Sequence, residues 1–190
     1  MHFLRWDLGC CGSSAIASDA PGDVAASLPL ATFAAGCFWG VQLHFQRLDG
    51  VVESHVGYCG GTIDNPTYSQ VRKGNTGHAE ALQVQFDPAR ISYPQLLDKF
   101  WSMHNPTTKD QQKNDVGSQY RSAIFYHSEA QRVEAVASMK AHATNHDKPI
   151  VTEIVPAGRF FMAEDYHQKY LEKGGQCAGT GNTDLVRCYG

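Results

Sequence analysis

Apolar and polar positions alternate along the chain in short blocks that read as strands and helices. Residues 30–35 form an apolar run ended by Gly36, and residues 37–48 then carry apolar side chains at helical spacing. The same criteria, with capping signals at Ser92 and Ser128, predict strands at residues 50–58, 79–86, 120–126 and 150–155 and helices at residues 92–104, 128–143 and 162–172. Residues 60–77 and 105–119 are predicted to be loops.

The predicted element order is β-α-β-β-α-β-α-β-α, and its first six elements follow the split βαβ order of ferredoxin-like folds. We therefore expect an α/β (α+β) two-layer sandwich, in which helices pack on a mixed or antiparallel sheet. A chain of 190 residues suits one domain. We expect a flexible N-terminal tail at residues 1–28, a catalytic domain at residues 29–172 and a long Gly-rich C-terminal tail at residues 173–190.

Composition narrows the class of protein. With 18% charged residues and a net charge of −3, the chain lacks the basic surface that nucleic-acid binding requires. We find neither an apolar run of the ~20 residues needed to span a membrane nor a secretory signal. Six unevenly spaced cysteines indicate redox chemistry in a reducing compartment more than a disulfide framework. We expect a cytoplasmic monomer and leave organellar targeting open. The cysteines are Cys10, Cys11, Cys37, Cys59, Cys177 and Cys188.

Cys37 is the candidate nucleophile because it stands where a predicted strand meets a predicted helix. Unpaired N–H groups and the dipole at a helix start favour the thiolate, which is the reactive form. Gly36 leaves room beside the sulfur, and Phe38 and Trp39 offer aromatic surface for a methyl or thioether group. The alternative is that Cys37 is a small buried hydrophobic residue and that the aromatic side chains belong to the core.

Residues 36–40, Gly-Cys-Phe-Trp-Gly, resemble the signature of the A-type peptide methionine-sulfoxide reductases. The resemblance runs from about residue 32 to residue 171 and continues through residues 57–61, 65–68, 77–80, 114–122 and 163–168. It implies reduction of methionine S-sulfoxide, free or within oxidised proteins and peptides, to methionine. It implies neither a metal nor an organic cofactor.

The resemblance also implies roles for individual residues. Glu80 is the general acid that protonates the departing oxygen, and Tyr68 and Tyr120 hydrogen-bond that oxygen. Phe38 and Trp39 bind the substrate, and Asp115 orients it. From the residues alone, Glu80 reads as a solvated carboxylate and Asp115 as a turn former.

A Cys37 sulfenic acid would need a second thiol for its removal. We expect Cys177 to attack it first, forming a Cys37–Cys177 disulfide. Cys188 would then attack this disulfide, leaving a Cys177–Cys188 disulfide for thioredoxin to reduce. The resemblance to plant-type members at residues 187–190 leaves the order open. Cys59 could compete as a resolving thiol or simply fill space, and the roles of Cys10 and Cys11 stay open.

Four features depart from the family pattern: Gln42 in place of an acidic residue, Lys113 in place of glycine, Ser118 in place of threonine, and the wide spacing of Cys177 and Cys188. The first suggests that electrostatics near Cys37 differ from those of relatives. The next two are mild changes in the substrate loop.

Two other functions are compatible with parts of the sequence. His78 could serve as the base of a Cys-His acyl hydrolase with Cys37, and the thiols could form a non-catalytic redox sensor. His142 and His146 stand four residues apart, but they lack the intervening glutamate and a third ligand of a zinc site, so we expect them to face solvent.

Overall fold

A six-stranded sheet with the order β7-β6-β1-β3-β2-β8 organises the chain. The structure is a computed structural model that describes residues 27–188. The four central strands are antiparallel, and β7 pairs with β6 in parallel. The strands of this sheet are β1 (Leu30–Ala35), β2 (Val51–Cys59), β3 (Ala79–Phe86), β6 (Ser122–Tyr126), β7 (Glu153–Pro156) and β8 (Phe161–Met162). A separate hairpin joins β4 (Gln111–Gln112) to β5 (Asp115–Val116).

Residues 27–188 form five α-helices and two short 3-10 helices, of which the last two in the chain follow the last strand. The helices are α1 (Phe38–Gln46), α2 (Tyr68–Val71), α3 (Tyr93–Met103), α4 (Glu129–Ala143) and α5 (Tyr170–Lys173), with η1 (Ser118–Tyr120) and η2 (Asp165–His167). Side-chain caps stabilise the N-termini of three helices: Thr67 caps α2, Ser92 caps α3, and Ser128 caps α4. None of the helices within residues 27–188 has the length and apolarity needed to cross a membrane.

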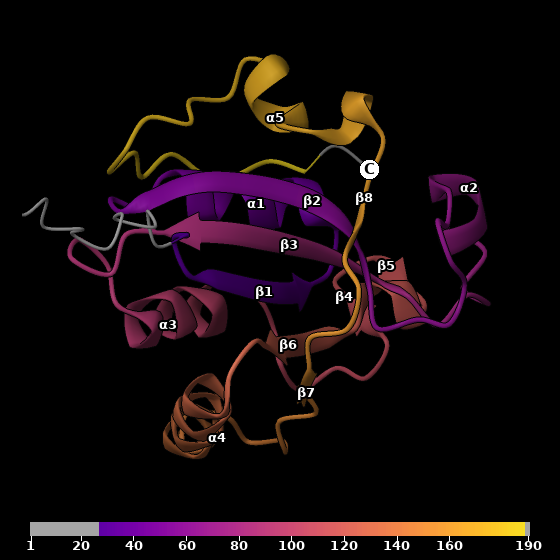
Figure 1. The fold of residues 1–190 in the computed structure, drawn as a ribbon. Coiled ribbons are helices and arrows are strands. Elements are labelled where there is room, and N and C mark those ends of the chain that lie inside the picture. Colours follow the sequence, from indigo (N-terminus) through magenta and orange to yellow (C-terminus); the bar gives the residue numbers. More distant parts are fainter. Residues whose placement is uncertain (1–26, 189–190) are drawn as a thin grey trace, which may run out of the picture.

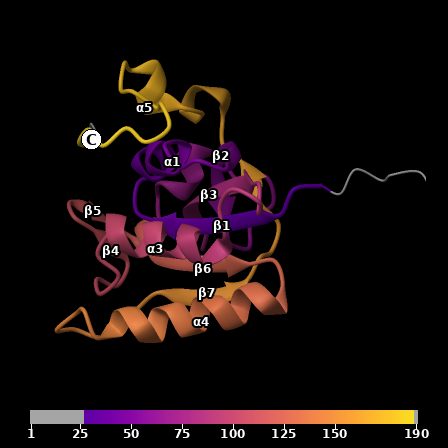
Figure 2. The same cartoon turned by 90° about the vertical axis from the view of Figure 1, so that its left-hand side faces the viewer.

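The larger core lies between the sheet and the helices α1 and α3. Phe33 of β1 stacks on Phe45 of α1 and on Phe100 of α3, and all three side chains are fully buried. Figure 2 shows the strands following one another from β2 to β7, with α5 beyond β2 and α4 beside β7. The opposite face of the sheet carries mainly small residues, covered by Val155, Ala157 and Phe160.

The predicted fold class is confirmed. The strand order β6-β1-β3-β2, with helices packed on the sheet, is that of the split βαβ arrangement. The extra strands β7 and β8 extend the sheet at its two edges, and the parallel pairing of β7 makes it mixed.

The predicted helix at residues 162–172 is wrong. The segment forms β8, η2 and α5, with Lys169 between the last two at a φ of 53°. Tertiary hydrogen bonds replace helical ones, because the Gln168 amide bonds both the N–H and the carbonyl of Val56 on the edge of β2. The two predicted loops also contain regular structure, namely α2 and the β4–β5 hairpin, and Tyr120 lies in η1 instead of in the strand.

The C-terminal end of the described chain runs beside α1 without helix or strand after α5, as the yellow trace in Figure 1 shows. The expected N-terminal tail lies outside the described residues except for residues 27 and 28, as do Cys10 and Cys11.

Candidate active site

Cys37 lies at the N-terminus of α1, directly after β1. Gly36 makes the turn with a φ of +89°, and a side chain there would come within 2.7 Å of the Gln112 Cβ atom. Only glycine fits this close approach without displacing Gln112. The thiol is therefore held, half-buried, beside the unpaired N–H groups of the first helical turn.

Glu80 reaches the same helix start from β3. Its Oε2 accepts a hydrogen bond from the Phe38 N–H at 3.1 Å, and the residue is only 2% exposed. Burial raises the pKa of Glu80 to about 8, although the Phe38 N–H opposes the shift by stabilising the carboxylate. At neutral pH most of this carboxyl group is protonated, as a proton donor must be.

Tyr68, Tyr120 and Asp115 come from separate elements to the same cavity as Cys37 and Glu80. The cavity has a volume of about 740 Å³. Burial, followed by the charge of Glu80, raises the pKa of both phenols, so both remain hydrogen-bond donors at neutral pH. Burial also raises the pKa of Asp115. The structure thus brings together all of the predicted catalytic side chains.

Phe38 and Trp39 form the aromatic wall of this cavity. The Trp39 indole donates to the Nδ1 atom of His167 at 3.0 Å and stacks on Tyr170 with ring centroids 4.0 Å apart. These contacts fix the plane of the indole. The cavity therefore combines an apolar wall with several convergent polar groups, as small-molecule sites do.

Glu164 is a residue near the site that the sequence did not single out. One of its oxygens accepts from the Tyr58 hydroxyl at 2.8 Å, and the other accepts from the backbone N–H of Tyr68 at 2.9 Å. Glu164 therefore ties the start of α2, and with it the Tyr68 phenol, to the sheet. Its position in the family-like segment 163–168 was the available signal, but spacing alone suggested only a polar helix.

The Cys188 side chain lines the same cavity as Cys37, close enough for the two thiols to influence each other's pKa. It rests on Gly40, where an added side chain would come within 2.5 Å of the Cys188 sulfur. The Cys188 contact, burial and the Glu80 charge raise the pKa of Cys37, although the Trp39 N–H opposes the shift. The expected Cys37 thiolate is thus not favoured in this state. The same contact lowers the pKa of Cys188 to about 7.

Cys177 and Cys59 are not among the residues that line the Cys37 cavity. Cys177 is exposed, and its backbone carbonyl accepts a hydrogen bond from Arg47. Cys59 is fully buried on the opposite face of the sheet, among side chains that include Ala34 and Phe125. Burial raises its pKa to about 11. Its environment fits the space-filling interpretation.

His78 is not among the residues that line the Cys37 cavity, which argues against the Cys-His hydrolase hypothesis. Its Nδ1 atom accepts from the Gly61 N–H at 3.1 Å, and its Nε2 atom donates to the Ile63 carbonyl at 2.8 Å. With both nitrogens bonded to backbone, the ring has no free position for taking a proton from Cys37.

Two departures from the family pattern have defined surroundings. Gln42 donates to the Ser54 carbonyl and accepts from the Lys169 N–H, and it is not part of the cavity lining. It therefore contributes to packing between α1 and β2, and not to the lining around the thiol. Lys113 does line the cavity, and its charge lowers the pKa of Cys188 and of Asp115 in opposition to burial.

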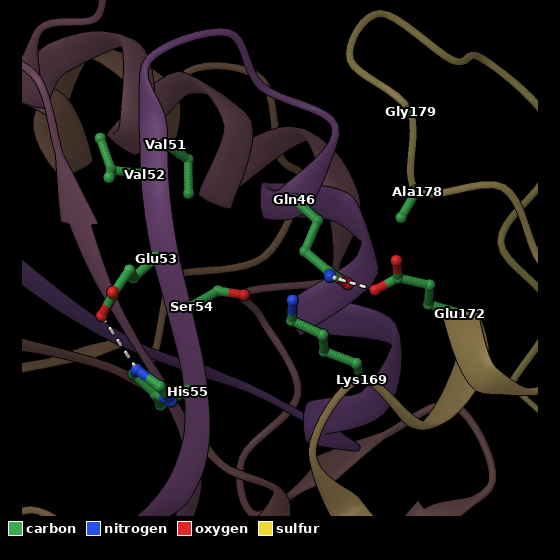
Figure 3. A pocket seen from close by; sticks show the side chains of 10 residues that line it. All are labelled: Gln46, Val51, Val52, Glu53, Ser54, His55, Lys169, Glu172, Ala178 and Gly179. Atoms are coloured by element: carbon green, nitrogen blue, oxygen red, sulfur yellow. Dashed lines mark hydrogen bonds and ion pairs between the residues drawn. The ribbon is translucent and has the colours of Figure 1, made fainter.

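A second cavity of about 450 Å³ lies at the edge of β2. Figure 3 shows that it is bounded by β2, by Lys169 and Glu172, and by Ala178 and Gly179 of the C-terminal segment. It contains no thiol. Within residues 27–188 we find no cluster of three or more His, Cys, Asp or Glu side chains suited to a metal ion.

The geometry agrees with comparisons to known proteins. The family model described as peptide methionine sulfoxide reductase matches residues 29–183. Peptide methionine sulfoxide reductase A2-1 of Oryza sativa is 51% identical over 176 residues, covering 93% of this chain and 94% of the relative.

Two solved structures are also similar. Reduced Mxr1 of Saccharomyces cerevisiae matches with a TM-score of 0.76 and 37% identity, covering 80% of this chain and 89% of the other. Mxr1 in complex with Trx2 matches with a TM-score of 0.56 and 29% identity, covering 77% and 86%. The chain described here is therefore a member of the peptide methionine sulfoxide reductase family of oxidoreductases.

Proposed function

We propose that this chain reduces methionine S-sulfoxide, both free and peptide-bound, through a sulfenic acid on Cys37. The observation that carries the proposal is the shared cavity, in which the Cys37 thiol, the Glu80 carboxyl group and two phenols converge. Its aromatic wall of Phe38 and Trp39 suits the methyl group and thioether chain of the substrate.

In the first half-reaction, the Cys37 sulfur attacks the sulfoxide sulfur while Tyr68 and Tyr120 donate hydrogen bonds to the sulfoxide oxygen. Glu80 gives its proton to that oxygen. The protonated oxygen is transferred to the Cys37 sulfur as methionine leaves. Asp115 orients the substrate from the rim. A protonated Glu80 also favours the attack, because its carboxylate form raises the pKa of Cys37.

In the second half-reaction, a thiol condenses with the sulfenic acid and releases water. The contact between Cys188 and Cys37 supports Cys188 as the first attacking thiol, whereas the sequence-based expectation put Cys177 first. Cys177 would then attack the Cys188 sulfur and free Cys37. A thioredoxin would reduce the Cys177–Cys188 disulfide, in line with the complex between the structural relative and Trx2.

The test is an assay on a mixture of sulfoxide epimers, with the remaining substrate resolved chirally. We expect the S epimer to disappear. Without reductant we expect about two equivalents per chain, because the exchange to Cys177–Cys188 frees Cys37 for one more oxidation, and with dithiothreitol or thioredoxin we expect many equivalents. A hydrolytic product would favour an acyl hydrolase, and a single turnover that dithiothreitol cannot renew would favour a redox sensor. Mass spectrometry after one turnover identifies the first disulfide.

We also propose that the enzyme works as a monomer in the cytoplasm. Support for the compartment comes from the four cysteines within residues 27–188, which are free thiols, as is usual in a reducing compartment. Light scattering of the purified chain and fractionation of the source cells test the two statements separately.

A further inference from the structure

Residues 174–188, here called the C-terminal arm, carry both recycling thiols but make little apolar contact with the body. None of the side chains in the arm is fully buried, and Leu185 is 78% exposed. Burial of apolar surface therefore contributes little to holding the arm, apart from half-buried residues such as Val186 beside Gly40. The contacts that the arm makes with the body are mainly hydrogen bonds.

Arg47, directly after α1, makes three of these contacts. Its Nε atom donates to the Cys177 carbonyl at 2.9 Å and its Nη1 atom donates to the Asp184 carbonyl at 2.6 Å. Its own carbonyl accepts from the Gly181 N–H at 2.9 Å. The residue is only 7% exposed, so these bonds are shielded from water. One arginine thus fixes the arm at three points.

Gln176 closes the arm into a loop. Its side-chain amide donates to the Arg187 carbonyl at 2.6 Å and accepts from the Arg187 N–H at 3.0 Å, as a paired strand would. Residues 176 and 187 directly precede the two recycling cysteines in the chain. These two bonds therefore join the segments that carry Cys177 and Cys188, although the two cysteines are eleven positions apart in sequence.

The cavity at the edge of β2 lies beside the first part of the arm, at Ala178 and Gly179. Figure 3 shows Ala178 and Gly179 facing β2 across this cavity, while the Gln46 amide donates to Glu172 at 2.8 Å beside it. The arm therefore does not pack closely on β2 at this point. Its resting position then depends on the bonds from Arg47 and Gln176.

We propose that Arg47 and Gln176 are positioning residues of the recycling half-reaction. They hold the arm so that the Cys188 sulfur meets the Cys37 sulfenic acid, with Cys177 close enough for the following exchange. The sulfenic acid and the Cys188 thiol give a disulfide and water. Cys177 then attacks the Cys188 sulfur, and Cys37 leaves as a thiolate. This inference rests on the proposed function but concerns only the steps after methionine has left.

The test compares Arg47→Lys and Gln176→Leu with wild type in single-turnover experiments. Lysine keeps the charge of Arg47 but replaces the two nitrogens that bond to separate carbonyls with a single ammonium group, and leucine keeps the bulk of Gln176 without its hydrogen bonds. Arg90→Lys, at an exposed pair with Asp49, is the arginine control. Thr183→Val is the control within the arm, because no side-chain hydrogen bond of Thr183 is found within residues 27–188.

We expect both variants to reduce the first equivalent of sulfoxide within about twofold of the wild-type rate. Formation of the Cys37–Cys188 disulfide should slow about tenfold, because an undocked arm lowers the effective concentration of the thiol. Turnover with thioredoxin should fall accordingly, and turnover with high dithiothreitol should not, since a small dithiol can reach Cys37 directly.

The inference is overturned if either variant forms this disulfide at the wild-type rate, or if Thr183→Val slows it equally. Because Gln176 lies outside the folded body, its variant stays informative even if Arg47→Lys unfolds. Failure of wild type to reduce one sulfoxide per chain would instead refute the proposed function, so the two failures are distinguishable.

Discussion

Cys37 and Cys59 lie on opposite faces of the same sheet and show what a protein environment does to one kind of side chain. Cys37 precedes α1 in the lining of a cavity that it shares with a second thiol and a carboxyl group. Cys59 ends β2 in an apolar cluster with no exposed surface. A substrate can therefore reach the Cys37 thiol through its cavity, whereas the Cys59 thiol is inaccessible.

The comparison also shows that a raised pKa alone does not separate a reactive thiol from an inert one. Both pKa values are raised, but for different reasons. Desolvation is the main cause at Cys59, and only local unfolding can relieve it. At Cys37 the main cause is the contact with Cys188, followed by burial and the Glu80 charge, and movement of the arm or protonation of Glu80 relieves part of it.

The largest expected effect separates the two thiols directly. Cys37→Ser should abolish sulfoxide reduction, to below a few per cent of wild type, because a hydroxyl is a poor nucleophile without a strong base. Cys59→Ser should keep the wild-type rate of the first turnover. Stopped-flow measurement of methionine release tests both variants, with circular dichroism to show that each is folded. Equal losses in the two variants would refute the assignment of Cys37 as nucleophile.

Glu80→Gln should lower the rate of the chemical step by about 10²- to 10⁴-fold, the range typical of a lost general acid. Glutamine can still accept the Phe38 N–H, so the fold around the helix start should survive. Glu80→Asp should retain part of the rate. If single-turnover rates barely changed, the proton would have to come from elsewhere, and Tyr68 and Tyr120 would be the next candidates.

Removing one phenolic hydroxyl should have a smaller effect. Tyr68→Phe and Tyr120→Phe should each slow the chemical step by about 10- to 100-fold, because one oxygen-binding donor remains in each variant. Tyr126→Phe, remote from the cavity lining, is the matched control. A double variant that is no slower than either single variant would show that the two phenols do not share the oxygen.

The pH dependence should report the raised pKa of Glu80. The proton needed for transfer is present below about pH 8 and is lost as the pH rises through that value, because burial favours the neutral form. The wild-type rate relative to Glu80→Gln should therefore fall about tenfold from pH 7 to pH 9. Using this ratio cancels most of the ionisation of Cys37 itself. A constant ratio would contradict the role of Glu80 as acid.

Much of this fold was predictable, because the elements that build the sheet carry clear periodicity and caps. Ser92 and Gln95 predicted α3, and both halves of the capping box are present. The end of the domain was not predictable, since long-range bonds such as that of Gln168 to Val56 decide its path. Thr67 and Gln70 form a similar capping box whose signal was available but not used.

The catalytic side chains could be named from motifs, but their environment could not. Burial of Glu80 depends on how β3 meets α1, and no spacing rule gives that contact. The helix start at Cys37 correctly indicated nearby N–H groups, but the raising effect of Cys188 depends on the path of the arm. Sequence motifs therefore identify the catalytic residues, but the packing around each residue determines its protonation state.

The smallest effect concerns Cys59 and asks whether its thiol only fills space. Cys59→Ala should destabilise the protein by about 1–2 kcal/mol, because it leaves a small void in a close-packed cluster. Methionine release and thioredoxin-driven turnover should both stay at wild-type rates. Urea unfolding measures the first quantity, and the two kinetic assays measure the others. In wild type, Cys59 should also resist alkylation until urea opens the fold, whereas exposed Cys177 reacts at once. Lost turnover at unchanged stability would instead show that Cys59 takes part in recycling, and the contrast between the two faces would fail.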